Sequence, residues 1–162
     1  MVSNEEILVN KRNGRGKEAL QIDKIHAMVG FATDGITGVS ASHVEMNSGI
    51  QLFDGISTAD IQQILIKSAN DLITLESPNY QYVAARLLLF SLRKQLFHRL
   101  WDHPKLIDHI KKLIDMGLYD KDILVNYDES EIDRMNMWID HERDYNFTYA
   151  GLRQVMDKYL VQ

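Results

Sequence analysis

The spacing of apolar positions changes along the chain, and this change predicts its elements. Short apolar runs at 7–10 and 19–22 are interrupted by polar residues and predict two strands. Asn13 and Gly14 stand between them, and this pair favours a tight hairpin turn because both residues tolerate a positive φ. A further apolar run, IQLFDGI at 50–56, predicts a third strand with an Asp-Gly turn at its end. The sequence therefore predicts a small sheet.

Four segments between residues 23 and 97 have the spacing of three to four residues that is typical of amphipathic helices. Each segment is preceded by a residue type that stabilises a helix N-terminus, either by accepting a backbone hydrogen bond or by fixing φ. The predicted N-terminal residues are, in chain order, Asp23, the capping box of Ser42 and Glu45, Ser57 or Thr58, and Pro78 with Asn79.

The pattern changes again near residue 100. Helices beyond His103 have shorter apolar faces, and Pro104 interrupts the chain at the same point. These two features predict a first domain at 5–99 and a helical segment at 100–162. The predicted fold class is mainly α, more fully α+β, with a small sheet lying over about four helices and further helices after it.

Composition limits the classes of protein that fit. Of the 162 residues, 45% are hydrophobic and 25% charged, which is typical of a globular protein rather than a disordered one. The longest apolar stretch, VAARLLLFSL at 83–92, holds an arginine and is shorter than the roughly 20 residues of a membrane helix. No early apolar stretch resembles a secretory signal, so we expect a cytoplasmic protein without a membrane partner. Because the chain has no cysteine, disulfides, thiolate zinc sites and thiol chemistry are excluded within it.

Charge is unevenly distributed. The net charge of −5 argues against a protein that coats nucleic acid, since such binding depends on Lys and Arg over a broad surface. A small anion could still be bound locally, because five basic residues fall within the first 24 positions. They are Lys11, Arg12, Arg15, Lys17 and Lys24.

The stretch GRGKE at 14–18 shares only some features with a phosphate-binding P-loop. A P-loop needs Ser or Thr after its lysine to hold magnesium, and it joins a strand to a helix. Here Glu18 follows Lys17, and the next predicted element is a strand. A nucleic-acid arm would need aromatic support, and the nearest aromatic residue is Phe31. An exposed charged hairpin explains Arg15 and Lys17 well. It explains Lys11, Arg12 and Lys24 less well, because these cations flank the strand and the start of the helix.

Four segments together resemble a known family. They are LVNKRNG at 8–14, DGISTADI at 54–61, PNYQYVAARLLLFSLRK at 78–94 and IDHERDYNFTYAGLRQVMDKYLVQ at 139–162. Their order resembles the N-terminal region of the large (alpha) subunit of class I ribonucleoside-diphosphate reductase, of the bacterial and T-even-phage type. The resemblance covers essentially the whole chain. It implies that 5–99 form an ATP-cone, a nucleotide-binding regulatory domain built as a four-helix bundle capped by a three-stranded sheet, and that 100–162 lead into the reductase barrel.

The resemblance also implies a site for ATP or dATP. Lys11 and Arg12 match the family's pair of cations at the nucleotide phosphates, and Lys94 matches a lysine on the fourth helix with the same role. Thr58 matches the threonine that opens the third helix, where free N–H groups can receive phosphate oxygens. The residues implied around the adenine and ribose are the polar Glu18, Gln21 and Lys24 and the apolar Ile25.

This chain departs from the family at positions that bear on regulation. Enterobacterial relatives carry histidines near the phosphates where this chain has Gln62 and Ser91. Those positions are tied to strong dATP feedback, so the resemblance implies nucleotide binding more directly than inhibition. Gln21 stands where some relatives have Asn, so discrimination between ATP and dATP can differ.

The implied function is allosteric. ATP and dATP, with Mg²⁺, would compete for the cone and favour different assemblies of the large subunit with the small, radical-bearing subunit. This would set the overall activity of deoxyribonucleotide synthesis for DNA replication. The family reduces ribonucleotides with cysteines on the barrel, so a chain that has no cysteine and ends at Gln162 is expected to be inactive alone. We expect it to be an excised or truncated piece of the large subunit, or one half of a split one.

The segment DHERD at 140–144 could hold a metal ion, because its acidic residues share a helical face with His141 beside them. Acidic helix faces are common, however, and no second ligand group lies nearby in sequence. His98, His103 and His109 are too irregularly spaced to form a ligand set. We therefore predict no protein-bound metal.

The alternative function is a non-catalytic helical interaction or DNA-binding module with a degenerate cone. Some transcriptional regulators join an ATP-cone to a cysteine zinc ribbon, and the absence of cysteine counts against that version. We expect no nucleic-acid partner.

Overall fold

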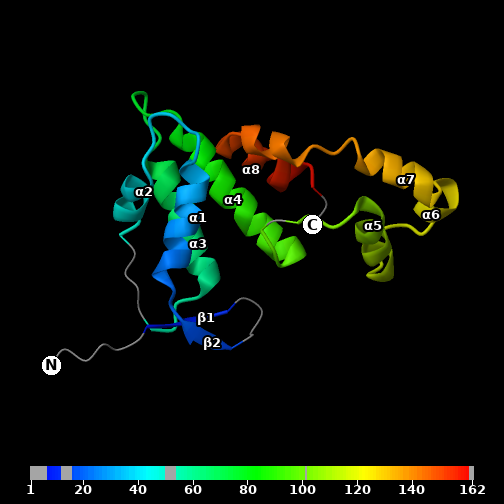
Figure 1. Ribbon diagram of the computed structural model, residues 1–162, viewed down its shortest axis with the longest axis horizontal. Coiled ribbons are helices and arrows are strands. Elements are labelled where there is room, and N and C mark those ends of the chain that lie inside the picture. Colours follow the sequence, from blue (N-terminus) through cyan, green and yellow to red (C-terminus); the bar gives the residue numbers. More distant parts are fainter. Residues whose placement is uncertain (1–6, 12–15, 50–53, 101, 161–162) are drawn as a thin grey trace. The chain divides into compact units, whose positions relative to one another are not determined.

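The computed structural model describes residues 7–11, 16–49, 54–100 and 102–160. They form a mostly helical protein with a small antiparallel sheet (Figure 1). The chain divides into two compact units, one made of Met1–Leu92 with Tyr145–Gln162 and the other of Arg93–Asp144. Helix α4 (Tyr80–Phe97) begins in the first unit and ends in the second.

The sheet of the first unit is a hairpin. Strand β1 (Leu8–Asn10) pairs antiparallel with β2 (Lys17–Ala19), and Val9 lies opposite Glu18 in the register. Val9 is buried, so the short sheet has one face toward the core. The predicted hairpin is confirmed, while its predicted turn at 12–15 lies mostly outside the described residues.

The other edge of β1 pairs with the segment that leads into the third helix. Asn10 donates its N–H to the carbonyl of Ile56 at 3.0 Å, and Gly55 donates to the carbonyl of Leu8 at 2.9 Å. A parallel bridge between Asn10 and Ser57 completes this contact. The predicted third strand falls largely on 50–53, outside the described residues, and its described end runs beside β1.

Four helices lie where the apolar spacing predicts them. The first three precede α4 and are α1 (Ile22–Thr33), α2 (Ala41–Asn47) and α3 (Thr58–Asp71). Ser57 is the N-cap of α3, as predicted, and its side chain accepts a hydrogen bond from the N–H of Asp60 at 3.0 Å.

Two predicted caps are wrong. Asp23 is the second residue of α1, whose N-cap is Gln21, although a carboxylate in the first turn still favours the positive end of the helix. Ser42 is likewise the second residue of α2, and Ser40 is the N-cap. The backbone N–H of Ser40 donates to the hydroxyl of Tyr80 at 3.1 Å, a contact distant in sequence that local spacing does not contain.

Helix α4 is the central element of the first unit, because apolar residues are buried around most of its circumference. The ring of Phe90 lies 5.6 Å from that of Phe31 on α1. Helices α2 and α3 are joined by Ser68, whose hydroxyl donates to the carbonyl of Val44 at 2.6 Å. The buried apolar residues of α4 are Tyr80, Val83, Ala84, Ala85, Leu87, Leu88, Leu89 and Phe90.

Arg86 ties the end of α1 to α4 and to Tyr145, which lies in the 3-10 helix η2 (His141–Asn146) ahead of the last helix, α8 (Tyr149–Lys158). Its guanidinium donates to the carbonyl of Asp34 at 2.7 Å, just past the end of α1. It also lies 5.4 Å from the ring centre of Tyr145, a cation–π contact. A cation at this end of α1 is favoured by the helix dipole.

The second unit has a smaller core of its own. It holds α5 (Leu106–Asp115), α6 (Ile123–Asn126), α7 (Glu129–Asn136) and most of a 3-10 helix, η2 (His141–Asn146). Helix α7 begins with a capping box of Asp128 and Glu131. The buried residues at the centre of this unit are Ile107, Ile110 and Ile132.

The compact units are groups of residues in contact rather than domains, so the division into 5–99 and 100–162 stays a prediction. The part of the chain that the structure describes contains no helix long and apolar enough to cross a bilayer.

Ser57→Ala should lower the free energy of unfolding by about 1 kcal/mol, because the first turn of α3 loses its side-chain acceptor. Ser42→Ala is the matched control, since Ser42 is exposed and is not the N-cap of α2. Its effect should stay within about 0.5 kcal/mol. Urea unfolding followed by circular dichroism measures both, and a larger loss for Ser42→Ala would contradict the observed caps.

Candidate functional site

The end of β1 lies beside the start of α3, and this brings two predicted phosphate contacts to one edge of the sheet. Asn10 and Ser57 form the parallel bridge, and Lys11 and Thr58 are the next residues of the two segments. The side-chain amide of Asn10 also donates to the carbonyl of Gly55 at 2.6 Å, which fixes the turn before α3. Figure 1 shows α1 and α3 both beginning at the sheet.

The N-terminus of α3 offers backbone donors at this edge. Ser57 accepts the N–H of Asp60, whereas the first N–H groups of a helix, here those of Thr58 and Ala59, have no carbonyl partner within it. Such a terminus has a partial positive charge and can bind an anion. The carboxylate of Asp60 accepts a hydrogen bond from the Ser57 hydroxyl at 2.6 Å, so it already offsets part of that charge.

Lys11 is paired in this structure. Its Nζ lies 2.8 Å from Oε2 of Glu18, and the two side chains are 41% and 32% exposed. Glu18 lies on β2 and Lys11 directly follows β1, so the hairpin register sets their distance. A ligand phosphate at Lys11 would therefore share this cation with Glu18 or displace that carboxylate.

The predicted contacts for the base and sugar lie on β2 and the first turn of α1. Gln21 is the N-cap of α1, and its carbonyl accepts the N–H of Lys24 at 3.1 Å. Both side chains are exposed, whereas Ile25 is half-buried and can offer an apolar surface. Glu18 lies on β2, so the four residues follow one another along one continuous stretch, from β2 to the first turn of α1.

Two other predicted cations are outside this group. Arg12 lies outside the described residues. Lys94 is described and exposed, and it lies on α4 past the end of the first unit. It follows Ser91 by three residues and Leu87 by seven, so these three positions share one face of α4. The roles of Arg12 and Lys94 stay predictions.

Gln62 and Ser91, the two departures from the enterobacterial pattern, are both buried, with 2% and 7% of their surface exposed. The side-chain amide of Gln62 donates to the backbone carbonyl of Leu87 at 3.0 Å. Gln62 stands one turn after Thr58, so this bond connects the first turns of α3 directly to α4. Gln62 thus has a structural role in this structure, which its sequence position alone does not reveal.

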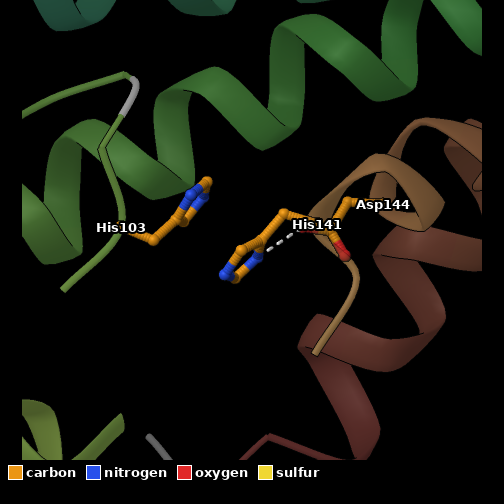
Figure 2. A group of neighbouring side chains, drawn as sticks. All are labelled: His103, His141 and Asp144. Carbon is orange, nitrogen blue, oxygen red and sulfur yellow. Dashed lines mark ion pairs between the residues drawn. The ribbon is translucent and has the colours of Figure 1, made fainter. Parts of the chain in front are cut away.

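A second cluster lies within the second unit and was missed from sequence. His103, His141 and Asp144 each offer a ligand atom, and these atoms lie within 4.8 Å of one another. The two imidazole rings are stacked, with centroids 3.6 Å apart and planes 9° apart. Nδ1 of His141 lies 3.6 Å from Oδ2 of Asp144 (Figure 2). His103 is 37 residues before the DHERD segment, and sequence spacing carries no signal of that approach.

The surroundings of His103 favour its neutral imidazole. Burial lowers the pKa of His103, and the positive charges of Arg93 and of a protonated His141 lower it further. Asp144 and Asp102 act in the opposite direction but with smaller effects. The buried Nε2 of His103 has no hydrogen-bond partner among the described residues.

Comparison with known proteins agrees with the family resemblance of the sequence. The family model for the ATP cone domain matches residues 7–95. The ribonucleoside-diphosphate reductase 1 subunit alpha of Escherichia coli is 46% identical over 159 residues, which cover 98% of this chain and 21% of the relative. The corresponding alpha subunit of Enterobacteria phage T4 is 39% identical over 156 residues, and that of Helicobacter pylori is 37% identical over 157. The chain thus spans about a fifth of the length of these curated relatives.

Gln62→Ala should lower the free energy of unfolding by roughly 1–3 kcal/mol, because it removes a buried hydrogen bond and leaves a gap between α3 and α4. Gln63→Ala is a matched control, since Gln63 is the next residue of α3 and is exposed. It should change that free energy by less than about 0.5 kcal/mol. If the two substitutions lowered the free energy of unfolding equally in urea, the hydrogen bond from Gln62 to Leu87 would contribute nothing to stability.

Proposed function

Because the chain belongs to the ATP-cone family, we propose that residues 7–95 bind ATP or dATP as an allosteric effector. The observation that carries this proposal is the extent of the family match, since every predicted nucleotide contact falls within it. The alternative, a DNA-binding or interaction module with a degenerate cone, gains no support from the relatives and is not proposed.

The phosphates bind at the edge of the sheet where β1 meets α3. Lys11 and the N–H groups at the start of α3 supply a cation and backbone donors, and the Thr58 hydroxyl can add a further donor. Arg12 adds a second cation and Lys94 a third. Three cations and a helix terminus match the negative charge of a triphosphate, and Mg²⁺ accompanies the nucleotide as its counterion.

The adenine and ribose lie at the corner of β2 and α1. Glu18, Gln21 and Lys24 provide acceptors and donors for the base edge and the sugar hydroxyls, while Ile25 offers an apolar surface to the ring. The ion pair of Lys11 with Glu18 supports this arrangement, because it holds a phosphate contact and a base contact on neighbouring strands.

The finer architecture of the domain is also proposed. Helices α1, α2, α3 and α4 form its four-helix bundle, and a third strand through residues 50–56 completes the sheet. The parallel hydrogen bonds from β1 to Gly55 and Ile56 support that strand, since they extend the ladder on the free edge of the hairpin.

The domain sets the activity of a ribonucleoside-diphosphate reductase in the cytoplasm. Its partners are the rest of the alpha subunit and the small subunit, and ATP and dATP favour different assemblies of these partners. An effector shifts such an equilibrium only by its difference in affinity for the two states, so dATP and ATP must contact them differently. Gln62 and Ser91, both buried here, stand where enterobacterial relatives carry histidines, so the proposal covers nucleotide binding and not strong inhibition by dATP.

Calorimetric titration of the 162-residue chain with dATP, ATP and GTP in magnesium buffer tests this function. The two adenine nucleotides should bind, and GTP should bind much more weakly. Lys11→Ala and Lys94→Ala should each weaken dATP binding by about 1.5–3 kcal/mol, the range for hydrogen bonds to charged groups. This is roughly a ten- to hundredfold rise in Kd.

Lys67→Ala is the matched control, because Lys67 is exposed on α3 and pairs with Asp71 near the other end of that helix. It makes the same change of charge and should leave the Kd unchanged. If Lys11→Ala and Lys94→Ala both retained full affinity, the phosphate assignment would be wrong. If none of the three nucleotides bound, the domain would be a degenerate cone.

A further inference from the structure

We propose that His103, His141 and Asp144 form a binding site for a divalent transition-metal ion of the zinc type in the second unit. The site shares no residue with the proposed nucleotide site, since none of the three is a predicted nucleotide contact, and all three belong to Arg93–Asp144. Figure 2 shows the three side chains coming from two segments, the stretch before α5 and the 3-10 helix η2.

The donor atoms are nearly close enough to share one ion. Two ligands about 2.1 Å from a tetrahedral zinc ion lie roughly 3.4 Å from each other. Nδ1 of His141 is 3.6 Å from Oδ2 of Asp144, and the donor atoms of all three residues lie within 4.8 Å of one another. Binding therefore requires the atoms to close by up to about 1.4 Å, from 4.8 to roughly 3.4 Å, and the stacked rings to turn toward one point.

The donor set selects the class of metal. Two of the three donors are imidazole nitrogens, which bind Zn²⁺, Co²⁺, Ni²⁺ and Cu²⁺ well. Mg²⁺ and Ca²⁺ prefer oxygen ligands, so the Mg²⁺ that accompanies a nucleotide would not occupy this site. Three protein ligands leave one position of a tetrahedral ion open for water.

The residues around the cluster already hold one ligand in place. The Arg93 guanidinium donates to Oδ2 of Asp144 at 2.9 Å, and the Arg93 side chain is only 4% exposed. A ligand carboxylate oriented by such a partner is typical of metal sites, and its negative charge offsets the nearby guanidinium. The unpartnered Nε2 of His103 is a buried nitrogen for which a metal ion would supply the missing interaction.

Titration of the chelator-treated chain with Zn²⁺ by calorimetry, and with Co²⁺ by visible absorption, tests the site. We expect one ion per chain, with the ligand-field bands of tetrahedral Co²⁺ and no competition from excess Mg²⁺. His103→Gln and His141→Gln should each weaken Zn²⁺ binding by roughly tenfold or more. Circular dichroism establishes that both variants are folded, and Asp144→Asn, which keeps an acceptor for Arg93, provides a third test if either is not.

His109→Gln is the matched control. The rings of His103 and His109 both lie edge-on to Phe97, at 6.0 and 5.4 Å, but only His103 belongs to the cluster. The control should bind Zn²⁺ as the parent chain does. The proposal is overturned if the parent chain binds no Zn²⁺ or Co²⁺, if both glutamine variants bind as tightly as the parent, or if only one of the two histidines matters.

Discussion

The hydrogen bonding of β1 on both of its edges is the constraint on which the positions of the sheet and of the helices that begin beside it depend. Strand β1 has only three residues, yet it pairs with β2 on one edge and with the segment before α3 on the other. Backbone donors and acceptors buried in such a small sheet must be paired, so these bonds fix the positions of two helix starts at once. Lys11 and Thr58 come together because each directly follows a residue of the bridge between Asn10 and Ser57.

Behind the sheet, α4 makes the positions of the other helices interdependent. A helix buried on most sides cannot shift without disturbing its neighbours, because close-packed interiors do not deform continuously. Gln62 adds a directional bond to this packing, since its amide reaches the carbonyl of Leu87. Arg86 adds another at the opposite end of α1, where it donates to the carbonyl of Asp34. Any change at the start of α3 therefore has a direct route to α4.

The sequence predicted those features that arise from local spacing. The hairpin, the four helices and the Ser57 cap follow from residues close in the chain, and all are found. The caps at Asp23 and Ser42 were each misplaced by two residues. At α2 the true cap, Ser40, is held by a bond to Tyr80 that spans 40 residues. The approach of His103 to His141 was missed for the same reason, because the two residues lie far apart in the sequence. Contacts between distant segments depend on packing, which a single sequence does not contain.

The ion pair of Lys11 and Glu18 bears on how a nucleotide could act as a switch. In this structure the cation is held by a carboxylate on the neighbouring strand, so a phosphate at Lys11 would share this cation with Glu18 or displace that carboxylate. Thr58, which follows the parallel bridge at the edge where β1 meets α3, stands one turn before Gln62. From there the bond of Gln62 leads to α4, which continues into the second unit. A ligand can bias a distant contact only if the connecting element has two arrangements, and α4 and η2 are the described elements that cross from one unit into the other.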